Sequence, residues 1–291
     1  MLYKVGLLQL ISFVMCLLNI SVVHASDQRL IITGSSTVAP LALEIAKRFE
    51  KLNQQVRIDV QTGGSSRGVA DARSGMADIG MVSRALKSSE SDLHEFALAQ
   101  DGIALIVNKS NPIQTLSKSA ITDIYRGNIT HWPQLSTRAS EAKKIVVVNK
   151  AEGRSTLELF LSYFGFKNSE IKAHVVIGDN QQGIKTVAGN PNAIGYVSVG
   201  AAEYEVGYGT PIKLLQLEGV EASVEQVKNG RFPLSRPLNF VTKAAPVGLA
   251  KRFIEYAGSA AVHDLVREHF FVPVIAAPSA VVADQRHRVQ N

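Results

Sequence analysis

The chain has 291 residues, of which 46% are hydrophobic and 19% are charged, so it is long enough to bury the core of one or two globular domains. Its formal net charge of +6 is a modest excess that favours an anionic ligand. The sequence has no long run of Lys or Arg and a single tryptophan, Trp132, which argues against nucleic acid as a partner.

The first 25 residues have the pattern of a signal peptide. Lys4 gives a short positive region, residues 5–23 are mostly apolar, and Ala25 supplies a small residue for cleavage. We expect cleavage near Ala25 and export to the periplasm, which would also remove Cys16, the one cysteine. A retained membrane anchor is the alternative, because the apolar stretch is about long enough to cross a bilayer.

Apolar strand-like runs then alternate with helical patterns, which is typical of an α/β fold with largely parallel sheets. The segment from Leu41 to Leu52 repeats apolar residues at helical spacing, with Pro40 where a first turn tolerates proline. In chain order we expect strands at 30–32, 56–60, 78–82 and 145–148, helices at 41–52, 69–73 and 156–164, and extended runs at 102–107 and 237–242.

The two extended runs have the character of crossings between two lobes. A chain that leaves one lobe near residue 108 and returns near 240 would form two lobes joined by two strands. We therefore expect residues 26–107 and 241–273 to form one lobe, residues 108–240 to form the other, and residues 274–291 to be a flexible tail.

Three short stretches place glycine and hydroxyl residues between an apolar run and the start of a helical pattern. The first N–H groups of a helix have no partner within it and, with the helix dipole, favour an anion. Ordinary helix capping explains any one of these stretches, but three together indicate an anion cradle. They are Gly34-Ser35-Ser36-Thr37, Gly63-Gly64-Ser65-Ser66 and Gly153-Arg154-Ser155-Thr156.

Three cationic residues lie close to these stretches in the sequence. Arg84 follows a predicted strand, where its guanidinium group can pair with two oxygens of a tetrahedral anion or can simply be solvated. Lys150 and Arg154 flank Gly153 and can offset the charge of an anion at that helix start.

One motif favours an enzyme instead. Residues 64–68 fit the Gly-x-Ser-x-Gly pattern, with Ser66 as the nucleophile of a serine hydrolase, which a serine-reactive probe would test. A hydrolase also needs an acid and a histidine, and no histidine here stands in a recognisable catalytic setting. The seven histidines are scattered without a His-x-x-x-His pair, so the sequence indicates no metal site and no cofactor.

Six motifs, in their order along the chain, resemble those of a known family: they lie at 32–40, 62–68, 77–84, 152–156, 193–197 and 232–238. Together they are similar to the phosphate-binding periplasmic components of ABC transporters, the PstS type. The resemblance implies a two-lobed type II periplasmic binding protein fold, with two mainly parallel sheets flanked by helices and joined by two crossing strands. It also implies a monomer without catalytic activity that captures inorganic phosphate and delivers it to a membrane permease. A phosphate sensor or surface protein without a transporter is the alternative, and neighbouring genes for a permease and an ATPase would distinguish them.

Carried over position by position, the resemblance and the nearby charges predict a phosphate site made of Ser36, Thr37, Ser65, Ser66, Ser83, Arg84, Lys150, Arg154, Ser155 and Thr156. Two positions depart from the longer family members: Ser83 stands where they carry an aspartate, and Lys150 stands where they carry a ligand arginine. A carboxylate acceptor lets a site require a protonated oxygen, which separates phosphate from sulfate. With Ser83, and with Glu152 as the nearest candidate acceptor, we expect weaker rejection of sulfate.

Overall fold

The computed structural model describes residues 28–136 and 144–274, so the predicted signal peptide and residues 275–291 of the predicted tail lie outside the described residues. In this part of the chain, no helix is both long and apolar enough to span a bilayer. In chain order the elements are β1 (Gln28–Gly34), α2 (Ala39–Leu52), β2 (Val56–Thr62), α3 (Ser65–Ser74), β3 (Ile79–Val82), η1 (Ser88–Glu90), β4 (His94–Asn108), β5 (Thr115–Leu116), α4 (Lys118–Arg126), η2 (Trp132–Gln134), β6 (Val146–Lys150), α5 (Ser155–Phe164), η3 (Asn168–Glu170), β7 (Val175–Ile177), α6 (Asn180–Gly189), β8 (Ala193–Ser198), α7 (Val199–Gly207), β9 (Ile212–Leu214), β10 (Gln216–Leu217), α8 (Val224–Lys228), β11 (Ser235–Thr242), α9 (Gly248–Ala257), η4 (Ala260–Val262), α10 (His263–Glu268) and β12 (Val272–Pro273).

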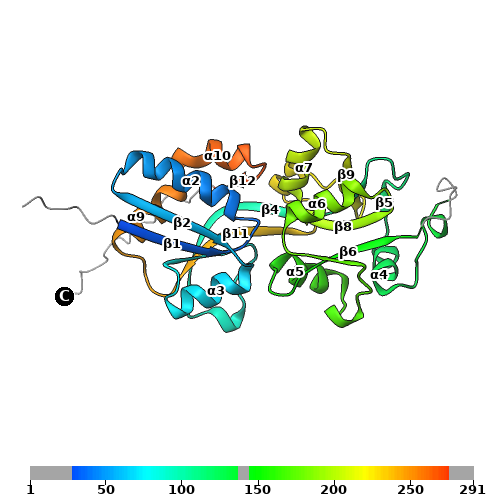
Figure 1. Cartoon of the computed structure of the whole chain (residues 1–291), viewed down its shortest axis with the longest axis horizontal. Helices are drawn as coiled ribbons and strands as arrows, with labels where there is room; N and C mark the ends of the chain where they lie inside the picture. Colours follow the sequence, from blue (N-terminus) through cyan, green and yellow to red (C-terminus); the bar gives the residue numbers. More distant parts are fainter. Residues whose placement is uncertain (1–27, 137–143, 275–291) are drawn as a thin grey trace, which may run out of the picture.

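Two lobes lie end to end and are bridged by the long strands β4 and β11 (Figure 1). In the first lobe β1 pairs in parallel with β2 and β3, and in the second lobe β6 pairs in parallel with β7 and β8. The predicted α/β architecture, with largely parallel strands and two crossing strands, is confirmed. The two parallel groups are joined in one hydrogen-bonded path, β2-β1-β3-β11-β4-β8-β6-β7, because the crossing strands pair with both of them.

Strand β4 changes its partner in the middle of the bridge. It is antiparallel to β11 up to Gly102, and from Ile103 to Val107 it is antiparallel to β8. The β4–β11 register places Arg236 directly opposite Asp101, beside this change of partner. The residue boundaries predicted for the two lobes stay a prediction.

The helix predicted at 69–73 begins four residues earlier, at Ser65. Gly64, with φ of 97°, lets the chain turn directly from β2 into α3, so Ser65 and Ser66 lie in the first helical turn. The predicted helix 41–52 is confirmed as α2, and the helix 156–164 is confirmed as α5, which ends at the left-handed Gly165.

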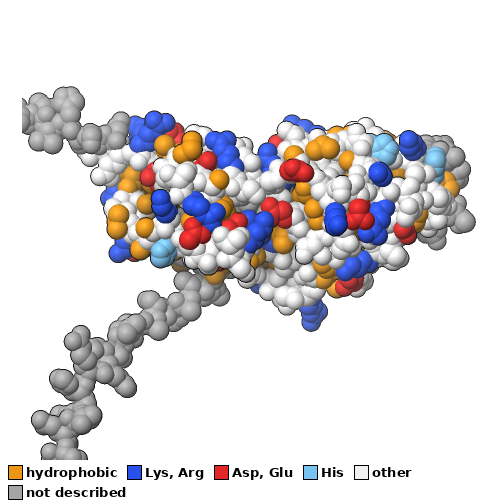
Figure 2. Space-filling model, turned by 90° about the horizontal axis from the view of Figure 1, so that it is seen from below, with side chains coloured by type: hydrophobic (Ala, Val, Ile, Leu, Met, Phe, Trp, Pro, Cys, Tyr) orange, Lys and Arg blue, Asp and Glu red, His pale blue; other side chains and the backbone are white. Residues whose placement is uncertain are grey.

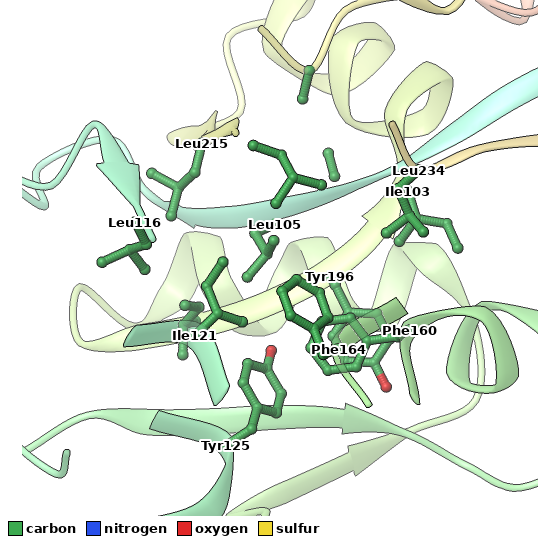
Figure 3. Close-up of a cluster of buried hydrophobic side chains, with 14 of the residues drawn as sticks. Ile103, Leu105, Leu116, Ile121, Tyr125, Phe160, Phe164, Tyr196, Leu215 and Leu234 are labelled. Carbon is green, nitrogen blue, oxygen red and sulfur yellow. The ribbon is translucent and has the colours of Figure 1, made fainter. Parts of the chain in front are cut away.

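Each lobe has a core that fixes the helices next to the bridge. In the first lobe Phe49 of α2 meets Phe253 of α9 edge to face, with ring centroids 5.5 Å apart, so α2 and α9 pack together. In the second lobe the rings of Phe160 and Tyr196 stack at 3.8 Å (Figure 3), which anchors α5 on β8. The start of α5, at Ser155, is thereby held toward the first lobe.

Candidate functional site

The three predicted glycine and hydroxyl loops meet where the two lobes face each other. The N–H groups of Gly63 and Gly64 both donate to the Gly34 carbonyl oxygen at 2.9 Å, which joins the first two loops. The N–H of Ser66 donates to the Gly153 carbonyl oxygen at 3.2 Å, which joins the second loop to the third across the lobes. We call the three loops 34–37, 63–66 and 153–156, together with the side chain of Arg236, the inter-lobe cradle.

Four buried serine hydroxyls form a continuous chain through the cradle. Ser35 Oγ donates to Ser83 Oγ at 2.9 Å, and Ser83 Oγ lies 2.6 Å from Ser155 Oγ. Ser65 Oγ donates to Ser155 Oγ at 2.9 Å. The structure therefore brings the predicted residues Ser65, Ser83 and Ser155 together, and it adds Ser35. The predicted Ser36 is half-buried and lines a groove of about 550 Å³ beside the cradle.

Arg236 is the residue that the sequence-based prediction of the site missed. Its Nη1 donates to Thr156 Oγ1 at 2.8 Å and its Nη2 donates to Thr37 Oγ1 at 3.3 Å, so it contacts a predicted residue in each of two loops. Its side chain is 1% exposed. The signal in the sequence was a single charged residue inside the motif 232–238, near the start of a crossing strand with no other charged residue.

Asp101 compensates the buried charge of Arg236. Its Oδ2 accepts from Nε and Nη2 of Arg236 at 3.1 and 2.9 Å, and its Oδ1 accepts from Ser198 Oγ and the Gly200 N–H at 3.0 and 3.2 Å. A buried ion pair is stable only when its remaining hydrogen-bonding groups are also satisfied, and both oxygens of Asp101 are. Asp101 thus holds Arg236 in place while Nη1 and Nη2 reach the threonine hydroxyls.

Two more cationic residues belong to the site: Arg154, within the third loop of the cradle, and Lys150, just before that loop. Lys150 is 3% exposed and its Nζ donates to Asn180 Oδ1 at 3.1 Å, while Asn180 Nδ2 donates to Thr37 Oγ1 at 3.2 Å. Burial, together with the nearby charges of Arg236 and Arg154, lowers the pKa of Lys150 to about 7, and Asp179 only partly opposes this. Arg154 Nε is buried without a hydrogen-bond partner among the described residues. This concentration of buried positive charge favours a bound anion.

Arg84 lies among carboxylates. Its Nη1 and Nη2 donate to the two oxygens of Glu90 at 2.7 and 2.8 Å, and its Nε lies 3.1 Å from Glu158 Oε2. Each of its three side-chain nitrogens therefore lies next to a carboxylate, and the ligand role of Arg84 stays a prediction. Glu152, which directly precedes the third loop, is exposed and accepts from Asn168 Nδ2 at 2.9 Å.

The predicted nucleophile Ser66 donates to Glu158 Oε1 at 3.1 Å, and within residues 28–136 and 144–274 no hydrogen bond joins it to a histidine. Over the same ranges no three His, Cys, Asp or Glu residues are grouped closely enough to hold a metal ion. What the site offers is hydroxyl groups, helix N-termini and cations, which is the chemistry that binds a small oxyanion.

A family model described as a PBP superfamily domain matches residues 21–261. The chain belongs to the PBP superfamily, and its relatives there are of the PstS type. The phosphate-binding protein PstS of Bacillus subtilis is 28% identical over 252 residues, which cover 84% of this chain and 80% of that protein. The predicted resemblance is thereby confirmed.

Solved structures agree with this membership in the PstS type. A putative phosphate ABC transporter substrate-binding protein with bound phosphate from Clostridium perfringens shares 33% identity and a TM-score of 0.77, covering 85% of this chain and 100% of that one. An ABC-type phosphate transport receptor from Vibrio cholerae shares 28% identity and a TM-score of 0.68, covering 84% and 99%. The predicted type II periplasmic binding protein fold is confirmed. Two of these relatives are named as binding proteins and the third as a transport receptor.

Proposed function

We propose that this PstS-type chain captures inorganic phosphate between its two lobes and delivers it to the permease of an ABC transporter. The observation that carries the proposal is the contact of one buried arginine, Arg236, with Thr37 of the first lobe and Thr156 of the second. Hydroxyl groups from both lobes and an arginine fork at one point are suited to a tetrahedral anion with four oxygens. The names of the relatives in the PstS type support phosphate as that anion.

In this proposal hydroxyl groups and the N–H groups at the starts of α3 and α5 donate to the phosphate oxygens, since these helix starts lie in the cradle. Three buried or half-buried cations offset its charge, and charged hydrogen bonds of this kind contribute about 1.5–3 kcal/mol each. The proposed ligand residues are Thr37, Ser65, Ser83, Ser155 and Thr156, with Arg236, Lys150 and Arg154 as the cations.

Calorimetric titration of the exported form with phosphate, sulfate, arsenate and molybdate tests this function. We expect one phosphate per chain, and we expect Thr156→Val to weaken binding about tenfold because Arg236 and the anion lose a shared hydroxyl partner. The matched control is Thr115→Val, on the exposed side of β5 in the same lobe. A natural protein that binds none of the four anions, or a Thr156→Val variant that binds phosphate as well as the control does, contradicts the proposal.

We further propose that the chain acts as a monomer in the periplasm after cleavage next to Ala25. N-terminal sequencing of the protein from a periplasmic fraction is expected to begin at Ser26. A measurement of phosphate uptake distinguishes delivery to a permease from sensing. Deleting the gene should abolish high-affinity uptake if the chain delivers phosphate to a transporter. Uptake should be unchanged if the chain is a sensor or a surface protein.

A further inference from the structure

Glu158, one turn after the start of α5, reaches from the second lobe into a group of first-lobe residues. We infer that Glu158, Arg84 and Lys87 form an inter-lobe latch that positions the two halves of the cradle and controls how fast its ligand leaves. The inference rests on the proposed function for its effect on binding, because closure of the lobes affects affinity only if the cradle holds a ligand.

The contacts of Glu158 cross from one lobe to the other. Its Oε2 lies 3.1 Å from Arg84 Nε and 2.7 Å from Lys87 Nζ, and its Oε1 accepts from Ser66 Oγ at 3.1 Å. All three partners belong to the segment from α3 to η1 in the first lobe. Side chains of both charge signs gather where the lobes meet on the face that carries α3 and α5 (Figure 2).

The first-lobe half of the latch is held in place by Glu90, a residue of the same lobe. Glu90 binds Arg84 through two hydrogen bonds, and its Oε2 also accepts from the Lys87 N–H at 2.9 Å. The side chains of Arg84 and Glu90 are only 4% and 9% exposed. The buried carboxylate of Glu90 therefore holds both the side chain of Arg84 and the backbone of Lys87, the two residues that pair with Glu158. Because they are already ordered, little conformational entropy is lost when the lobes close.

The latch shares its backbone with the serine chain of the cradle. Ser83 precedes Arg84, and Ser155 lies three residues before Glu158 on α5. The 2.6 Å contact of Ser83 Oγ with Ser155 Oγ and the Arg84–Glu158 ion pair are therefore two contacts between the same two segments. Loss of the ion pair would let these segments separate, and the apparent affinity of a ligand falls with the fraction of molecules in the competent state.

The first experiment measures phosphate binding and release by Glu158→Gln, which removes the charge and keeps the shape of the side chain. We expect the phosphate Kd to rise about tenfold, almost entirely through faster dissociation, because a bound ligand leaves when the lobes open and the latch opposes that opening. The matched control is Asp92→Asn, which removes an ion pair between Arg73 and Asp92 (2.6 Å) that lies wholly in the first lobe. An unchanged dissociation rate in Glu158→Gln, with both variants equally stable to heat, overturns the inference.

The second experiment needs no phosphate. The chain from Ser26 onward has no cysteine, so spin labels can be placed at Met76→Cys and Val176→Cys. Both positions are exposed; Met76 comes just after α3 of the first lobe, and Val176 lies in β7 of the second. We expect Glu158→Gln to shift the label–label distance distribution of the anion-free protein and Asp92→Asn to leave it unchanged. If this shift occurs in a protein that fails to bind phosphate, the latch stands and the proposed function fails. If the natural protein binds phosphate and Glu158→Gln changes neither the distances nor the dissociation rate, the latch fails alone.

Discussion

Two buried arginines lie at the junction of the lobes, and they differ in how many carboxylates surround them. Arg236 has one, Asp101, and its Nη1 and Nη2 also reach the hydroxyls of Thr156 and Thr37. Arg84 has two, Glu90 and Glu158, which take all three of its side-chain nitrogens. The donors of Arg84 are directed at carboxylates and at the Ala85 carbonyl oxygen, whereas two donors of Arg236 are directed at hydroxyls that can also bind an anion. The comparison therefore supports the proposals that Arg236 binds the ligand and that Arg84 acts in lobe closure.

The charges around the two arginines support the same proposals. Near Arg236 lie two further cationic residues, Lys150 and Arg154. The pKa of Lys150 is lowered by burial and by the positive charges of Arg236 and Arg154. Around Arg84, burial alone would raise the pKa of Glu90, but hydrogen bonds from Arg84 and from the Lys87 backbone outweigh it and lower that pKa. The end of the junction with Arg236 therefore has positive charge in excess, and the end with Arg84 is already paired.

The largest effect is expected at Arg236. Arg236→Gln leaves Asp101 as an unpaired buried charge, which destabilises the fold by about 3–5 kcal/mol, and we expect it to weaken phosphate binding by about a hundredfold or more. Arg236→Lys keeps the charge beside Asp101 but loses the fork to the two threonines, so it should remain folded and still bind about tenfold or more weakly. Thermal melting separates the two effects. A phosphate Kd in Arg236→Lys equal to that of the natural protein contradicts the assignment.

The sequence predicted the loops well because their signals are local. A stretch of four residues is enough to recognise glycine and hydroxyl residues between a strand and a helix. This local pattern was the basis for predicting Ser65, Ser155 and Thr156, which lie at helix starts in the structure. Arg236 was missed because its pairing with Asp101 depends on the register of β11 on β4, which joins residues 135 apart. No local pattern encodes such a register.

Arg84 and Ser35 show the same limit at shorter range. Arg84 and Arg236 are both lone arginines beside strands, and distant segments supply what distinguishes their surroundings: Glu158 of the other lobe beside Arg84, and Thr37 and Thr156 beside Arg236. Ser35 and Ser36 are neighbours of the same type, yet the tight turn after Gly34 (φ 131°) directs Ser35 to Ser83 and Ser36 to the groove. Side-chain direction at a turn of this kind depends on the backbone conformation that tertiary contacts impose.

An intermediate effect, dependent on pH, is expected at Lys150. The pKa of Lys150 in the folded protein is about 7, below its ordinary value of 10.5. Between pH 7 and pH 10.5 the ligand-free folded state therefore binds fewer protons than the unfolded state. The free energy of unfolding should rise as the pH rises through this range. A bound anion favours the ammonium form, so phosphate affinity should instead fall as the pH rises above about 7. Because phosphate titrates in this range as well, the measured quantity is the ratio of Kd for the natural protein to Kd for Lys150→Arg, whose charge is permanent. We expect this ratio to rise about tenfold from pH 7 to pH 8.5, and a ratio independent of pH would show that Lys150 does not contact the anion.

The smallest effect concerns selectivity, and it tests whether the Arg236 end of the junction lacks a hydrogen-bond acceptor for the ligand. Asp101 already accepts four hydrogen bonds, and Glu90 and Glu158 face Arg84 and Lys87, so none of these carboxylates is left to accept from a protonated phosphate oxygen. Ser83 Oγ can accept from such an oxygen, but it can equally donate to sulfate, so the cradle should select by shape and charge more than by protonation.

We expect millimolar sulfate to displace phosphate measurably in competition titrations. Ser83→Asp should raise the ratio of phosphate affinity to sulfate affinity by a factor of about three to ten, because a carboxylate repels an anion that has no proton to donate. Ser83→Ala should leave this affinity ratio unchanged. Phosphate binding that millimolar sulfate never disturbs would mean that another acceptor reaches the ligand, and that the count of carboxylates around the two arginines does not decide selectivity.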